Sequence, residues 1–186
     1  MKNISLSSKI LLATNGLILL SGAMLAPIYA LFVEKIGGSI LDASLTGGIF
    51  ALSAGITAIM SGKYTDKIKE SELIIVFGYF LLGIGFFLYS RVNSIYALFF
   101  VQILVGFGEA IYSPAFDAVY TKHMNKKSTG KLWGLWEGIN YFVISAGIML
   151  GGFIVFNFGF NILFYIMSSI TIISAIYMLF LPRKVL

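Results

Sequence analysis

Three carboxylates stand inside apolar segments of this chain, at Glu109, Asp117 and Glu137. Glu109 and Asp117 share the segment LVGFGEAIYSPAFDAVYTK, residues 104–122, and Pro114 stands between them. On insertion scales a charged side chain at the centre of a bilayer costs about 2.5–3.5 kcal/mol, so an acid in an apolar segment marks a candidate functional site. A carboxylate in apolar surroundings suits reversible protonation or the attraction of a cation. These residues therefore suggest proton or cation binding.

The composition indicates what kind of element must hold these acids. The chain has 186 residues, of which 59% are hydrophobic and 11% charged, whereas a soluble domain carries roughly 25% charged residues. Seventeen Phe and ten Tyr are more than one small soluble core can bury. With no Cys, thiol catalysis, disulfides and iron–sulfur clusters are excluded, and a single His leaves little scope for a metal site. We expect a polytopic membrane protein with no cofactor and no metal.

The apolar runs predict an all-α membrane protein that forms one six-helix transmembrane domain over residues 1–186. Each run is close to the roughly 20 residues that cross a bilayer as a helix. The expected spans cover about residues 10–33, 43–61, 73–90, 95–120, 132–156 and 162–181.

The positive charges predict the orientation of these spans. Alternate connections fall on opposite sides, and one side receives eleven Lys and Arg residues, whereas the other receives only Lys35 and Arg91. The positive-inside rule then places both termini in the cytoplasm. We expect a multi-pass protein of the cell (inner or plasma) membrane, and the distribution of the net charge of +5 argues against a nucleic-acid partner.

The depth of each acid in its span separates two roles. Glu109 lies thirteen residues from Lys122, where the fourth span ends, which is about 20 Å at 1.5 Å per residue. Asp117 lies only about 7.5 Å from that end, and Glu137 is similarly close to Lys131. We expect Glu109 to bind substrate or a proton, the alternative being a structural carboxylic acid. Asp117 and Glu137 are expected at an inner gate, the alternative being solvated helix-end charges.

Further candidates for the site of Glu109 lie on the same helical face or in other spans. Gln102 stands seven residues before Glu109, about 20° from the same face, and Tyr112 lies beside it. Trp136 is at the cytoplasmic end of the fifth span, where an interfacial aromatic belt is the alternative explanation. The candidate substrate- or proton-binding residues are Glu109, Gln102, Tyr112, Asn15, Asn140 and Trp136.

Two prolines occupy matching places in the first and fourth spans. Pro27 stands about eighteen residues past Lys9, and Pro114 about twenty residues past Ser94. Both are expected to kink their helices. Broken helices at corresponding positions of two three-helix units are typical of transporters built as 3+3 inverted repeats.

The loop SGKYTDKIKESEL, residues 61–73, resembles the signature loop of the major facilitator superfamily, G-x-L-x-D-R-x-G-R-[RK]. Gly62, Asp66 and Lys67 fall in register, whereas Lys69 stands in place of the second glycine and Glu70 in place of the following arginine.

The fourth and fifth spans extend this resemblance. In the fourth span Gly106 and Gly108 fit the family pattern, but Gln102 stands in place of its arginine. In the fifth span Gly147 and Gly151 have the spacing of the motif found in antiporter members, and Gly152 replaces its proline. The likeness covers all six spans, with degraded motifs.

The resemblance implies a secondary transporter that works by alternating access. An enzyme is not expected, because the sequence has no nucleophile or metal constellation and no run that matches a catalytic motif. Members normally contain two six-helix halves, so this chain is similar to a half-size member, and a parallel homodimer is expected. A separate second half and a truncated chain stay open. In the family, the loop acid and an acid of the fourth helix form a charge cluster that holds one conformation. The cytoplasmic gate implied here comprises Gly62, Asp66, Lys67, Asp117 and Glu137.

The expected substrate is a small organic solute. The partial antiporter motif favours proton-coupled export of a drug-like or cationic compound, whereas the missing arginine argues against proton coupling. The alternative within this class is a sugar transporter lined by Gln102, Asn140 and the tryptophans. A different class of function is a non-transporting membrane subunit that binds a partner.

Overall fold

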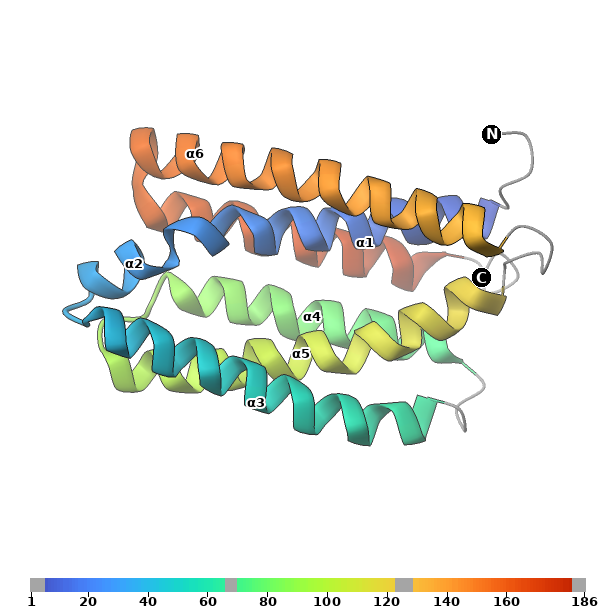
Figure 1. The fold of residues 1–186 in the computed structure, drawn as a ribbon, viewed down its shortest axis with the longest axis horizontal. Helices are drawn as coiled ribbons and strands as arrows, with labels where there is room; N and C mark the ends of the chain where they lie inside the picture. Colours follow the sequence, from blue (N-terminus) through green and yellow to red (C-terminus); the bar gives the residue numbers. More distant parts are fainter. Residues whose placement is uncertain (1–5, 66–69, 123–128, 182–186) are drawn as a thin grey trace.

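The computed structural model describes residues 6–65, 70–122 and 129–181, and these residues form a bundle of helices (Figure 1). An apolar segment that crosses lipid must satisfy its own backbone hydrogen bonds, and a helix does so within one segment. The elements in order are α1 (Leu6–Leu25), the short 3-10 helix η1 (Ala26–Ile28), α2 (Tyr29–Lys35), α3 (Ile40–Thr65), α4 (Ser71–Tyr89), α5 (Ile95–Lys122) and α6 (Thr129–Phe180). The all-helical class expected from the sequence is confirmed.

Within the described residues, five helical stretches are long and apolar enough to cross a membrane: 6–35, 40–63, 71–89, 95–122 and 129–180. The last has 52 residues, which would extend about 78 Å if straight, more than twice the roughly 30 Å of a bilayer core. It turns back at Gly159, whose φ of 79° and ψ of 173° are not helical. We call residues 129–158 the first arm of α6 and residues 160–180 the second arm.

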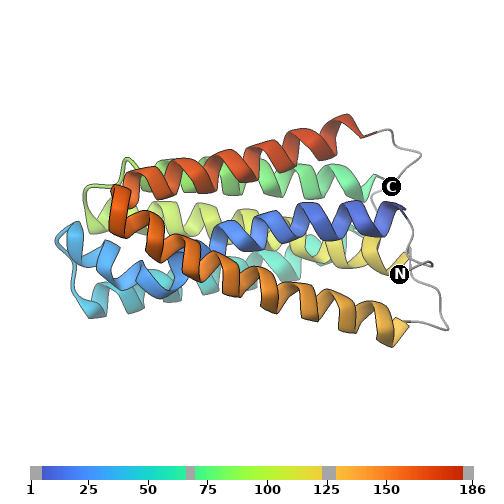
Figure 2. The same ribbon diagram turned by 90° about the horizontal axis from the view of Figure 1, so that it is seen from above.

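The two arms of α6 correspond to the expected fifth and sixth spans. Figure 2 shows α1 between them, with the arms meeting at the turn and diverging toward the other end of the bundle. The expected connection, residues 157–161, contains Gly159, but only this residue leaves the helical conformation. The other positive φ in the described chain is 86° at Gly37, in the expected turn between α2 and α3.

The described lysines and arginines divide between the two ends of the bundle. The end that holds the first and last described residues also holds Lys9, Lys63, Lys122 and Lys131. The opposite end holds Lys35 and Arg91. We call these the terminal end and the far end of the bundle.

Close packing of α1 against the first arm of α6 depends on two glycines. A Cβ atom on Gly147 would lie 2.8 Å from the carbonyl oxygen of Leu20, and one on Gly151 would lie 2.0 Å from that of Met24. These two glycines therefore let the backbones touch, as small residues do between membrane helices. A Cβ on Gly138, by contrast, would meet no atom within 4 Å.

The prolines have different local effects. Pro27 lies in η1, where the α-helical conformation is interrupted between α1 and α2. Pro114 lies inside α5, which continues past it. Proline has no N–H, so the carbonyl of Ala110, four residues earlier, loses its helical donor. Ser61 of α3 donates to that carbonyl oxygen at 2.7 Å, and so supplies the missing bond.

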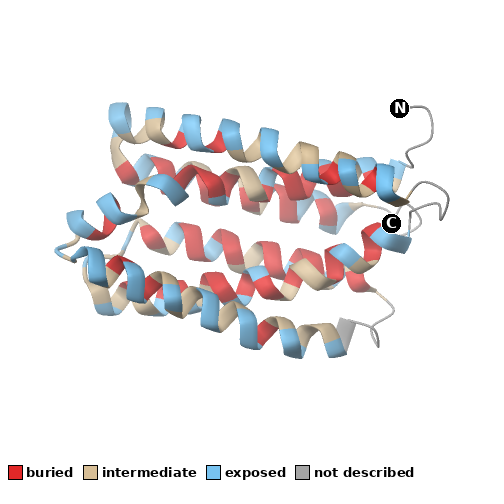
Figure 3. Cartoon of the chain, in the orientation of Figure 1, coloured by how far each residue is buried: buried red, intermediate tan, exposed pale blue. Residues whose placement is uncertain are grey.

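The buried side chains lie mainly on α1, α4, α5 and the second arm of α6, and α3 is covered least (Figure 3). Only 17% of its most apolar window is buried, against 39–50% for the other candidate spans. One side of α3 therefore has no packing partner within the described chain.

Candidate functional site

A cavity of about 500 Å³ is lined by residues of α1, η1, α2, α3, α4, α5 and both arms of α6. The described part of its wall is mostly apolar and aromatic, with one carboxylate and one amide. The lining residues used below are Tyr29, Phe50, Phe86, Tyr89, Gln102, Glu109 and Tyr112. Three predicted site residues from α5, Gln102, Glu109 and Tyr112, therefore meet in one cavity.

Among the described residues that line the cavity, Glu109 is the only charged one. It stands near the middle of α5, fourteen residues after Ile95 and thirteen before Lys122. Its side chain is exposed in the single chain, and it forms no hydrogen bond or ion pair with another described residue. The carboxylate is therefore available to a ligand that enters the cavity.

Gln102 belongs to a chain of hydrogen bonds that joins four helices beside the cavity. The Tyr89 hydroxyl donates to Gln102 Oε1 at 3.0 Å, and Gln102 Nε2 donates to the Tyr29 hydroxyl. Tyr29 in turn lies 2.6 Å from Thr46 Oγ1. Because Thr46 donates to the carbonyl of Asp42 at 2.7 Å, Tyr29 is the donor to Thr46. This chain fixes the amide and both tyrosine rings, so both polar atoms of the Gln102 amide are already paired within the protein.

Tyr112 lines the cavity, and Tyr79 and Asn15 lie behind it. Its ring packs edge-on against Tyr79, with 4.9 Å between ring centroids. The Tyr79 hydroxyl donates to Asn15 Oδ1 at 3.3 Å. Asn15 of α1 is therefore buried behind the tyrosines, and it does not line the cavity.

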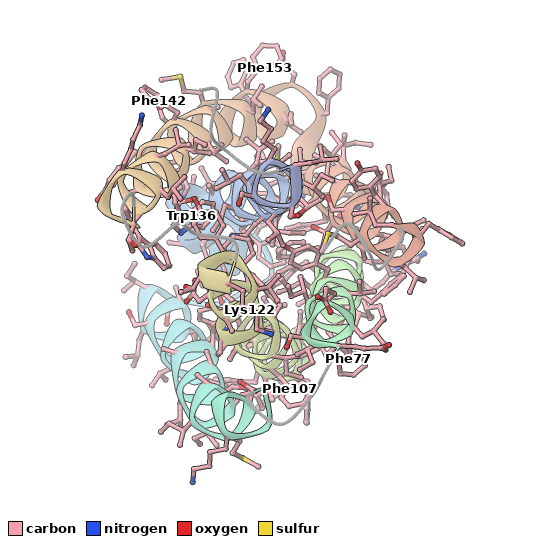
Figure 4. All side chains as sticks on the ribbon, turned by 90° about the vertical axis from the view of Figure 1, so that its right-hand side faces the viewer. Phe77, Phe107, Lys122, Trp136, Phe142 and Phe153 are labelled. Carbon is pink, nitrogen blue, oxygen red and sulfur yellow. The ribbon has the colours of Figure 1, made fainter. Side chains whose placement is uncertain are left out.

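Two further candidates from the first arm of α6 also lie outside the cavity wall. Trp136 is buried against Phe116, with 5.1 Å between ring centroids, and against Tyr120. Figure 4 shows Trp136 between α6 and α5, whereas Phe142 and Phe153 project outward. The amide oxygen of Asn140 is buried without a hydrogen-bond partner among the described residues.

The expected gate is described only in part, because Asp66 and Lys67 lie outside the described residues. Asp117 and Glu137 are exposed near the terminal end, and Gly62 is half-buried. In the part of the chain that the structure describes, neither acid forms an ion pair. The gate therefore stays a prediction.

Four aromatic residues of the cavity were not singled out from the sequence. Tyr29, Phe50, Phe86 and Tyr89 come from three helices, α2, α3 and α4. No spacing within one segment connects them. Each is an ordinary residue of an apolar span until the helices pack.

Comparison with known proteins agrees with this architecture. Residues 11–185 match the family described as the Major Facilitator Superfamily. The chain is 25% identical over 158 residues to the uncharacterized MFS-type transporter MJ1560 of Methanocaldococcus jannaschii, with 85% of this chain and 41% of the relative covered. It is 24% identical over 171 residues to the multidrug resistance protein MdtG of Proteus mirabilis, with 88% of this chain and 42% of the relative covered.

These two relatives are more than twice as long as the matched region, so the chain spans less than half of their length. A third relative is shorter. The uncharacterized MFS-type transporter YitZ of Bacillus subtilis is 23% identical over 159 residues, with 86% of this chain and 96% of the relative covered. The resemblance seen in the sequence is thereby confirmed, and the chain belongs to the Major Facilitator Superfamily, whose members are membrane transporters and not enzymes.

Proposed function

We propose that the chain is one half of a secondary transporter that moves a small organic solute by alternating access. One observation carries the proposal. Glu109, from the middle of a membrane helix, lies in a cavity with no hydrogen bond or ion pair to another described residue. An intramembrane carboxylate is costly to keep, and a ligand or proton that binds there accounts for its presence.

We further propose that the chain is a single domain of six membrane crossings, built as 3+3 repeats with cytoplasmic termini. The two arms of α6 support six crossings, because each is about as long as a single span. Pro27, where the α-helix is interrupted, lies in the first crossing, and Pro114 lies in the fourth. Prolines at these corresponding places are expected for two repeats of three helices. The excess of described lysines at the terminal end supports the orientation.

The substrate class that the cavity suits best is a hydrophobic organic cation. Its wall includes the aromatic residues Phe50, Phe86 and Tyr112 as well as Glu109. An aromatic face attracts a cation within about 6 Å of its centroid, and the carboxylate supplies the opposite charge. One relative of the chain is named a multidrug resistance protein, which is consistent with such a substrate.

A sugar is the weaker alternative. A sugar binds through many hydrogen bonds, and the Gln102 amide is already paired with Tyr29 and Tyr89. Asn140 and Trp136, which were candidates for sugar binding, do not line the cavity. The wall therefore offers few free polar groups to a polyhydroxylated solute.

A homodimer would complete the site, and its interface is expected along α3 and the first arm of α6, which both contribute to the cavity wall. Each of these helices carries a row of exposed or half-buried residues, most of them small, at alternating steps of three and four, the spacing of a helix–helix seam. On α3 they are Gly48, Ala51, Gly55, Ala58 and Gly62. On α6 the same steps fall on Gly134, Gly138, Tyr141, Ser145 and Ile148, of which Gly134, Gly138 and Ser145 are small.

Cross-linking between two single-cysteine chains tests the homodimer, because the chain has no native Cys. Chains carrying Gly55→Cys, mixed in one membrane with size-tagged chains carrying Ser145→Cys, should form a mixed disulfide dimer. The two positions lie at similar depth, about 22 and 20 Å from the far ends of their helices. Phe77→Cys, exposed on α4 away from the proposed seam, is the control. No mixed dimer, or equal cross-linking by Phe77→Cys, would refute this interface.

Transport is tested in proteoliposomes with ethidium, a planar aromatic cation. We expect Glu109→Gln to reduce ethidium flux about ten- to a hundredfold, because a charge-assisted contact contributes about 1.5–3 kcal/mol. Glu34→Gln, an exposed acid outside the cavity, should leave the flux unchanged. Ethidium flux that is insensitive to Glu109→Gln would contradict the assigned role.

Proton coupling is proposed through the same carboxylate. A pH gradient across the proteoliposome should drive ethidium accumulation by the wild type and not by Glu109→Gln, which should keep its fold. In a homodimer two copies of Glu109 face a shared cavity and titrate as a coupled pair. Accumulation by the variant with the wild-type pH dependence would exclude this role.

A non-transporting subunit that binds a partner is the alternative of another class. It would explain the degraded family motifs and the length of the matched region. If the folded protein supported neither uptake nor counterflow of ethidium or of a sugar panel, this alternative would replace the transporter proposal.

A further inference from the structure

Two apolar grooves run along the face of α1 that points away from the cavity. The first, of about 490 Å³, lies between α1 and the first arm of α6 and includes Lys9, Leu12, Leu20, Leu135 and Ala146. The second, of about 330 Å³, lies between α1 and the second arm. Lys9, Ala13 and Leu17 line both grooves, so they form a ridge that separates them. We call these residues the α1 ridge.

The length of the grooves fits one leaflet of a bilayer. From Lys9 to Leu20 the first groove extends over eleven residue steps of α1, about 16.5 Å at 1.5 Å per step. The second extends over eight residue steps, from Lys9 to Leu17, or about 12 Å. Half of a hydrocarbon core of roughly 30 Å is about 15 Å. Each groove therefore suits one extended acyl chain.

Polar and charged groups gather where both grooves reach the terminal end. Lys9 is exposed and lines both of them. Lys131 is exposed one helical turn before Leu135, on the side of α6 that lines the first groove. Tyr177 lines the second groove near the same end of the second arm. Cations at this depth attract anionic head groups, and tyrosine is favoured at the membrane interface.

We propose that the α1 ridge and its two grooves bind one glycerophospholipid with an anionic head group. Its two acyl chains lie on either side of the ridge, and its phosphate lies at Lys9 within reach of Lys131 and Tyr177. A two-chain lipid explains why two apolar grooves converge on one cation. The site is separate from the transport cavity, since the two grooves share no lining residue with it.

Native mass spectrometry of the full chain tests this site. The delipidated protein is titrated with an equimolar mixture of phosphatidylglycerol and phosphatidylcholine that carry the same acyl chains. We expect the wild type to retain one phosphatidylglycerol per chain, with a preference of about fivefold for each contributing cation. Lys9→Gln should lower that preference about fivefold. Lys63→Gln, an exposed lysine at the same end that lines neither groove, should not change it.

A second variant tests the contribution of the grooves to lipid binding independently of the charge of Lys9. Ala13→Phe places a large ring on the exposed ridge, and it should abolish retention of both lipids while the thermal unfolding midpoint in phosphatidylcholine stays at the wild-type value. The proposal is overturned if Lys63→Gln reduces the preference as much as Lys9→Gln does, since the effect is then a diffuse surface charge. Retention of phosphatidylglycerol by Ala13→Phe, or no retention by the wild type, would overturn it as well.

Discussion

Replacing Ser61 with alanine tests how α3 compensates for the proline in α5. Ser61 donates to the Ala110 carbonyl at 2.7 Å, and that carbonyl has no helical donor because Pro114 lacks an N–H. Interhelical hydrogen bonds in membrane proteins contribute about 0.6 kcal/mol on average and up to about 1.7, whereas a buried acceptor without a partner costs about 1–3 kcal/mol. We therefore expect Ser61→Ala to lower the free energy of unfolding by about 1–2 kcal/mol.

The same substitution should cost much less in a Pro114→Ala background. Alanine at position 114 restores an N–H that can donate to the Ala110 carbonyl, so Ser61 is no longer needed. The double-mutant cycle should show a coupling energy of about 1 kcal/mol. Ser53→Ala is the matched control, because Ser53 donates from α3 to the Ile103 carbonyl of α5 at 2.9 Å, and the residue four after Ile103 keeps its N–H.

Reversible unfolding in mixed micelles, driven by a denaturing detergent and followed by circular dichroism, measures the four free energies of the cycle. All variants are compared at one protein concentration, because association would change apparent stability. An equal cost of Ser61→Ala in both backgrounds would refute the reasoning. Coupling of Ser53→Ala to Pro114→Ala of the same size would refute it too.

Two further predictions concern glycines, and each is measured by the same unfolding assay. Gly151→Ala should destabilise the protein by about 1–3 kcal/mol, because its Cβ would lie 2.0 Å from the Met24 carbonyl oxygen. The control Gly152→Ala, where a Cβ meets no atom within 4 Å, should leave the stability unchanged or raise it by up to about 1 kcal/mol. Equal effects of the two substitutions would contradict the packing of α1 against α6. Gly159→Ala should destabilise by about 1–3 kcal/mol, since its φ of 79° with ψ of 173° belongs to a region that only glycine occupies readily; an unchanged stability would contradict the turn.

The helical segments were predictable from the sequence because length and hydrophobicity decide them. The predicted fourth span, 95–120, agrees closely with α5, Ile95–Lys122, and the predicted second span, 43–61, lies inside α3, Ile40–Thr65. The least predictable boundary was the turn in α6. Its sequence indicates a loop of several residues, yet a single Gly159 reverses the chain, because one residue with positive φ suffices.

The candidate site was predictable only along one helix. Gln102, Glu109 and Tyr112 share a face of α5 by spacing, and they line one cavity. Asn15 and Trp136 were selected by residue type, which does not determine how their helices are rotated. That rotation depends on packing between helices, such as the contact of Trp136 with Phe116. No pattern within one span reports such a contact.

Several of the contacts between helices use a main-chain oxygen on one side. Ser53 and Ser61 donate to carbonyls of α5, and Gly151 packs on a carbonyl of α1. Every residue type supplies the same carbonyl oxygen, so substitution on the acceptor helix leaves these contacts intact as long as the new side chain fits. At these contacts, the constraint on residue type therefore falls on one of the two helices. A bundle held in this way can keep its architecture while most of its side chains diverge, as they have between this chain and relatives at 23–25% identity.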